Sequence, residues 1–272
     1  MVPSLSVILM AVNILIAFAL PIGAVVFMKK KYHVNLQPLA MGLCAMYLFA
    51  FVLEAFVNRI VAISPLGSVL TGNMLLYVIY GGIMAAVFEE FGRFITMRKF
   101  MKRFHDDRIN SITYGIGHGG FEFVMILGIG MIENFYFAYM INADKIGELT
   151  AGLEGIQVET INQAVEQLKT VSPLTFLASP VERIAAFILQ IALSVLVWHG
   201  VINPGKIKYF CIALFAHFFM DCVPVYINLQ GAPIWLTESL IWVIALAVAA
   251  YTYLQVWKKE TPENANTVNQ IN

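Results

Sequence analysis

Seven long runs of apolar residues constrain the fold of this chain more than any other feature of its sequence. Each run reaches the roughly 20 residues that a helix needs to cross a bilayer. The runs cover residues 4–28, 38–58, 74–97, 111–141, 181–200, 207–228 and 233–256. Of the 272 residues, 60% are hydrophobic and only 12% are charged, whereas a soluble domain carries about 25% charged residues. We therefore predict an all-α, multi-pass integral membrane protein with about seven transmembrane helices.

Lysines and arginines predict the orientation of the chain, because they concentrate in cytoplasmic loops. They gather after the first run, between the third and fourth, before the sixth and after the seventh. We place the protein in the plasma membrane of a prokaryote, with its N-terminus outside and its C-terminus in the cytoplasm. Residues 1–260 are then a single membrane domain with an extracellular loop at 142–180, and the polar residues 261–272 are a disordered tail.

Composition also limits the partners. The formal net charge is zero, so nothing favours nucleic acid, and the lipid bilayer is the expected environment. Within the loop, apolar residues at near-helical intervals over 156–168 predict an amphipathic helix that lies on the membrane or is solvated. The sequence does not determine the oligomeric state.

Ionisable residues inside three of the runs are the second unusual feature. A charge in hydrocarbon costs roughly 2.5–3.5 kcal/mol, and such residues usually serve a site inside the membrane. The third, fourth and sixth runs carry Glu89, Glu90 and Arg93, then His118 and Glu122, then His217 and Asp221. In each group the first and last residues are four positions apart. Residues at this spacing share one face of a helix.

The three groups also lie at one predicted depth. Glu89, His118 and His217 each stand nine or ten residues from a basic residue at the predicted cytoplasmic end of their run. At a rise of 1.5 Å per residue, this separation is about 13–15 Å. We therefore expect the groups to form one site in the cytoplasmic half of the membrane. Glycines flank His118 over residues 115–120, which predicts close helix contacts or room for a substrate backbone.

Carboxylates and imidazoles in this combination suit the hydrolysis of an acyl bond. A glutamate and a histidine can activate water as a general base, and a second histidine can stabilise an oxyanion. Alternatively, one divalent metal could activate the water, with zinc the metal that this donor set favours. The predicted ligands are His118, Glu122, His217 and Asp221. The sequence leaves the metal-dependent and the metal-free alternatives open.

The motifs resemble those of the CAAX-protease and bacteriocin-processing superfamily. Glu89-Glu90-x-x-Arg93, Tyr114-x-x-x-His118 and His217-x-x-x-Asp221 are similar to its EExxR, FxxxH and HxxxN or HxxxD patterns. The block from Gly117 to Glu122 resembles more narrowly the YhfC branch of intramembrane metalloproteases, and PrsW-like proteases share the pattern. The resemblance covers residues 80–225. Tyr114 stands in place of the usual Phe, and Asp221 stands where prenyl-protein proteases carry Asn.

The resemblance implies an intramembrane endopeptidase that cuts a membrane-associated peptide or protein. Glu89 would activate water with His118, while His217 and Asp221 would bind the oxyanion or help to hold a metal. Glu90 would join this catalytic group, and Arg93, Tyr114 and Glu122 would support it. A carboxylate at position 221 favours the metal somewhat over a pure oxyanion site.

Two other functions stay open on the sequence: an ion- or proton-coupled transporter, and a non-catalytic membrane partner protein. Aligned acids and histidines also form proton relays. A second set of polar residues falls toward the predicted outer ends of the runs: Glu54, Glu133, Asn134, Glu182 and Glu238. We expect a hydrogen-bonded belt there, with an outer vestibule or ion path to the inner site as the alternative.

Overall fold

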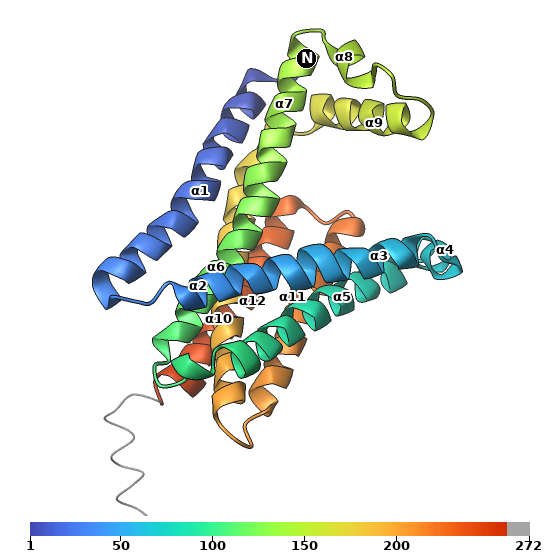
Figure 1. Cartoon of the computed structure of the whole chain (residues 1–272). Coiled ribbons are helices and arrows are strands. Elements are labelled where there is room, and N and C mark those ends of the chain that lie inside the picture. Colours follow the sequence, from blue (N-terminus) through green and yellow to red (C-terminus); the bar gives the residue numbers. More distant parts are fainter. Residues whose placement is uncertain (260–272) are drawn as a thin grey trace, which may run out of the picture. The chain divides into compact units, whose positions relative to one another are not determined.

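The computed structural model describes residues 1–259 and consists of helices, with no strand in that part of the chain. Seven helical segments are long and apolar enough to cross a membrane (Figure 1). They are Ser4–Tyr32, Gln37–Ala62, Met74–Phe100, Ile109–Asn142, Pro173–Ile202, Lys208–Leu229 and Ile234–Trp257. The predicted all-α, multi-pass architecture is confirmed. The orientation of the termini stays a prediction, and the predicted tail at 261–272 lies outside the described residues.

Four of the seven segments contain a π-helical turn. In the second segment, η1 (Tyr47–Glu54) separates α2 (Gln37–Met46) from α3 (Ala55–Ala62). In the fourth, η4 (Val124–Ile129) separates α6 (Ile109–Phe123) from α7 (Gly130–Asn142). Turns of the same kind, η2 (Thr96–Phe100) and η5 (Tyr253–Trp257), end α5 (Met74–Ile95) and α12 (Ile234–Thr252). Such turns occur often at functional sites.

The fifth segment begins earlier than its apolar run indicated. The run suggested a start at residue 181, but α10 spans Pro173–Ile202 and includes Pro180. A proline inside a helix cannot donate to the carbonyl four residues before it. That carbonyl belongs to Phe176, and it accepts instead from the buried Asn13 Nδ2 at 2.7 Å. The hydrogen bond from α1 (Ser4–Tyr32) satisfies the carbonyl that Pro180 leaves without a helical donor.

The described chain forms two compact units. The first unit comprises Met1–Gly23 and Phe123–Arg183. It contains α8 (Ile146–Thr150) and α9 (Ile156–Thr170), so the helix predicted over 156–168 is confirmed. Val165 and Leu168 are buried on the inner face of α9, which packs on α7. Whether α9 also touches a membrane stays a prediction.

The second unit comprises Ala24–Glu122 and the residues from Ile184 onward. In it, α5 packs along α11 (Lys208–Leu229), and α11 packs along α12 (Figure 1). Glycines bring α6 against two neighbours. A Cβ on Gly117 would lie 2.8 Å from the carbonyl carbon of Leu39 in α2, and one on Gly119 would lie 2.7 Å from the Cβ of Gln190 in α10. The Gly-rich stretch thus serves close helix packing on both sides of His118.

Candidate active site

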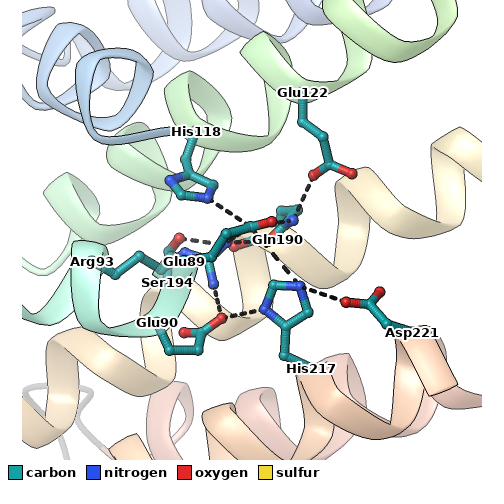
Figure 2. Close-up of polar contacts among 9 residues, drawn as sticks. All are labelled: Glu89, Glu90, Arg93, His118, Glu122, Gln190, Ser194, His217 and Asp221. Atoms are coloured by element: carbon teal, nitrogen blue, oxygen red, sulfur yellow. Dashed lines mark hydrogen bonds and ion pairs between the residues drawn. The ribbon is translucent and has the colours of Figure 1, made fainter. Parts of the chain in front are cut away.

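The structure brings the three predicted groups together in the second unit (Figure 2). α5 supplies Glu89, Glu90 and Arg93, α6 supplies His118 and Glu122, and α11 supplies His217 and Asp221. The i, i+4 spacing works as expected, because both members of each pair face the same cluster. α10 adds a residue that the sequence did not single out, Gln190.

The carboxylate of Glu89 lies at the centre of the cluster. Its Oε2 atom is 3.1 Å from His118 Nε2, and it accepts from Gln190 Nε2 at 3.1 Å. Arg93 Nη2 donates to the same oxygen at 3.4 Å. Glu89 Oε1, by contrast, makes no hydrogen bond to any residue between 1 and 259. One oxygen of Glu89 is therefore held by three neighbours, and the other is left to accept a proton or bind a water.

Glu90 orients His217. Its Oε1 atom lies 2.7 Å from His217 Nδ1 and also accepts from Arg93 Nη1. An ionised carboxylate only accepts hydrogen bonds, so Nδ1 carries the shared proton and Nε2 faces the centre of the cluster. His217 Nε2 lies 3.9 Å from Glu89 Oε2 and 3.5 Å from Asp221 Oδ2. Glu90 thus fixes the ring so that its second nitrogen points toward Glu89 and Asp221.

Tyr114 and Glu122 contact the cluster in different ways. The fully buried ring of Tyr114 stacks on His118 with their centroids 5.9 Å apart. A phenyl ring would offer the same face, which explains why Tyr can replace the Phe of the motif. Glu122 Oε2 accepts from Gln190 Nε2 at 2.5 Å. Glu122 is therefore joined to Glu89 through one amide group.

Burial differs across the cluster. Glu90, Arg93 and His118 have no exposed surface, whereas the side chain of Asp221 is 35% exposed. Buried charges persist only when they are paired and hydrogen-bonded, and Arg93 meets that need for Glu89 and Glu90. Asp221 is thus the most exposed member of the cluster.

Gln190 was missed because a neutral amide stands out less than a charge in an apolar run. Gln190 lies in the segment Pro173–Ile202, which is the most buried of the seven: 72% of its most apolar stretch is buried. Gln190 itself is 3% exposed. The available signal was one amide inside an otherwise apolar stretch of residues 184–193. A polar group in such a place needs a partner, and here the partners are the charged groups of the cluster.

A family model described as "YhfC intramembrane metalloprotease" matches residues 16–247, which include every residue of the cluster. The chain belongs to the YhfC family. A relative from Bacillus subtilis (strain 168), described as "Uncharacterized membrane protein YhfC", is 34% identical over 204 residues. The aligned part covers 75% of this chain and 78% of the relative. No solved structure matches the chain.

The name of the YhfC family implies a metal, and the donor types here are those that zinc takes. Their arrangement, however, does not form a ligand shell. Within residues 1–259, no group of three or more His, Cys, Asp or Glu side chains is placed to hold one metal ion. N–H groups of Arg93 and Gln190 point at Glu89 Oε2, where a cation would need a free lone pair. The predicted ligands are thus gathered in one cluster, but their arrangement among residues 1–259 does not fit a metal ion.

The outer polar residues of this YhfC protein divide between the two units. In the second unit, Glu54 accepts from Asn58 Nδ2 at 3.2 Å, and the Tyr80 hydroxyl donates to Asn58 at 2.7 Å. In the first unit, Glu182 pairs with its neighbour Arg183. Each of these contacts lies within one unit. A continuous belt, or a path to the inner site, stays a prediction.

Proposed function

We propose that the protein is an intramembrane endopeptidase that hydrolyses a peptide bond of a membrane-associated peptide or protein. The observation that carries this proposal is the asymmetry of Glu89. Its Oε2 is held by His118, Arg93 and Gln190, while Oε1 has no partner among the described residues. This is the geometry of a general base beside two imidazoles in a largely buried site.

In the first step, Glu89 Oε1 removes a proton from a water molecule as the water oxygen bonds to the carbonyl carbon of the substrate. The carbonyl oxygen becomes negatively charged. As an imidazolium, with a proton on each ring nitrogen, His217 donates from Nδ1 to Glu90 and can donate from Nε2 to this oxyanion. The carboxylates of Glu89, Glu90 and Asp221 around the ring favour that charged form. An oriented donor of this kind stabilises the developing charge.

In the second step, the bond between the carbonyl carbon and the amide nitrogen breaks. The proton on Glu89 passes to the leaving nitrogen, so the products are a carboxylic acid and an amine, and Glu89 returns to its ionised form. His118 stays on Oε2 throughout. Its role is to keep the carboxylate oriented, with the Tyr114 ring packed on the imidazole.

The family name supports the reaction class and also implies a second route, through a metal-bound water. Elemental analysis of the purified protein tests that route, with His118→Gln as the comparison. Stoichiometric zinc in the wild type that is lost in the variant would replace the general-base mechanism by a metal-dependent one. Zinc at the same trace level in both proteins would support Glu89 as the base.

Comparison of protein N-termini in membranes from cells that carry wild type, Glu89→Gln or Glu133→Gln tests the proposal. Glu133 provides a matched control, since it is an exposed glutamate of a transmembrane segment in the first unit. The proposal expects new termini in or beside membrane segments with wild type and Glu133→Gln, and their loss with Glu89→Gln.

Other outcomes of this comparison would contradict the proposal. The same termini in all three strains, with folded protein in each, would indicate a non-catalytic membrane partner. Proton-coupled uptake that is lost with Glu133→Gln but kept with Glu89→Gln would indicate a transporter.

A further inference from the structure

Gln190 makes three polar contacts with charged residues from two other helices. Its Oε1 accepts from Arg93 Nη2 of α5. Its Nε2 donates to Glu89 Oε2 of α5 at 3.1 Å and to Glu122 Oε2 of α6 at 2.5 Å. The side chain thus joins α5, α6 and α10 at the centre of the cluster (Figure 2). Neither the motif pattern nor the family match assigns it a role.

The chemistry of the neighbours fixes which end of the amide faces which partner. A guanidinium group only donates hydrogen bonds, and an ionised carboxylate only accepts them. The amide oxygen must therefore face Arg93, and the amide nitrogen must face Glu89 and Glu122. Among side chains of this length, only glutamine offers an acceptor and two donor hydrogens together.

This contact bears on the orientation of Glu89. A carboxylate can rotate about its terminal bond and present either oxygen to water. Gln190 and Arg93 both donate to Oε2, and His118 lies against the same atom. Rotation would separate Oε2 from all three neighbours at once. The unbonded Oε1 is the atom left for water.

We propose that Gln190 is the positioning residue of the catalytic base: it holds Glu89 with Oε1 toward water and recruits Glu122 into the site. The inference rests on the proposed function to the extent that Glu89 is the base. Gln190 acts through Glu89 and touches no reacting atom. The amide nitrogen of Gln190 has a second hydrogen that needs an acceptor, and the Glu122 carboxylate provides it. This need explains why Glu122 lies one turn beyond His118.

Packing between α6 and α10 can be separated from this role. The close approach at Gly119 involves the Cβ and Cγ atoms of Gln190, not its amide group. Gln190→Met keeps an unbranched stem of similar length and removes both the donor and the acceptor. Leu193→Met is the matched control, because it also introduces a methionine at a fully buried position one turn along α10 but removes no polar group.

Steady-state cleavage by the purified full-length protein tests the inference. The substrate is a peptide that spans the bond identified by the N-terminal comparison. Gln190→Met should lower kcat by about 10- to 100-fold, the usual effect of losing a group that orients a ligand or base, with little change in KM. Leu193→Met should keep both constants. A Gln190→Met protein with wild-type kcat, or with its whole loss in KM, would overturn the inference.

Glu89→Gln in the same assay separates the two proposals. If Glu89→Gln is inactive and Gln190→Met is fully active, only the positioning role fails. If Glu89→Gln cleaves at the wild-type rate, Glu89 is not the base and the proposed mechanism fails together with the positioning role; if the wild type itself does not cleave, the proposed function fails.

Thermal unfolding gives a readout that needs no substrate. If Gln190 bonds Glu122, the midpoint loss of the Gln190→Met/Glu122→Gln double variant differs from the sum of the two single losses. Strict additivity would contradict the contact.

Discussion

Gly117→Ala is the substitution whose effect follows most directly from the helix packing around His118. In α6, a Cβ at position 117 would lie 2.8 Å from the Leu39 carbonyl carbon and closer still to the carbonyl oxygen. Ordinary van der Waals contact begins at 3.4 Å, so α2 and α6 must separate by at least 0.6 Å. The displaced residue is the direct neighbour of His118, which orients Glu89.

This displacement should lower activity by about 10- to 100-fold, since a misplacement of about 1 Å in a catalytic constellation can cost that much. Helix propensity acts in the opposite direction, because alanine is favoured over glycine by about 1 kcal/mol in a helix interior. Loss of activity would therefore reflect the clash rather than a weakened helix. The assay is the initial rate of peptide cleavage by the purified variant, with thermal unfolding to confirm that it folds.

Gly130→Ala provides the control for this prediction. Gly130 lies in the same transmembrane segment, and a Cβ there would meet nothing within 4 Å. Its activity should equal that of the wild type. If Gly117→Ala also retained full activity, the backbones of α2 and α6 would not be in contact beside His118, and the packing described here would be refuted.

Three further substitutions test other contacts. Asn13→Leu should lower the free energy of unfolding by about 1–3 kcal/mol, because the Phe176 carbonyl loses its donor beside Pro180; an unchanged thermal midpoint would contradict this. Arg93→Met should destabilise the protein by about 3–5 kcal/mol, since two buried carboxylates lose their cation; expression and unfolding measurements would show it. Glu90→Gln should reduce kcat by about 10- to 100-fold by loosening His217, and a wild-type kcat would exclude the orienting role.

The sequence alone predicted the features that depend on periodicity and hydropathy. Apolar runs located all seven membrane segments, because the length needed to cross a bilayer leaves little freedom. The i, i+4 spacing and the shared depth of Glu89, His118 and His217 indicated residues that the structure brings together. Hydropathy and residue spacing are properties of the sequence itself, so they can be recognised without knowledge of the tertiary contacts.

Features that depend on tertiary partners were not predictable. The predicted start of α10 was wrong because it followed the apolar run from residue 181, whereas the helix begins at Pro173 and continues through Pro180. Asn13 from a distant helix satisfies the carbonyl that the proline leaves open. Gln190 has no charge to mark it, and its role follows from three contacts across helices. The arrangement of hydrogen-bond donors around Glu89 also depends on contacts between helices and could not be predicted. Residue types suggested a metal, but the N–H groups that face Oε2 appear only in the folded protein.

The most direct test of the central claim is the rate of peptide cleavage by purified wild type, Glu89→Gln and Glu133→Gln reconstituted in lipid vesicles. Glutamine keeps the shape of Glu89 and removes its basicity, and general-base catalysis contributes about 10²- to 10⁴-fold. We predict a loss of that size for Glu89→Gln and none for Glu133→Gln. Cleavage by Glu89→Gln at the wild-type rate would contradict the assignment of Glu89 as the base.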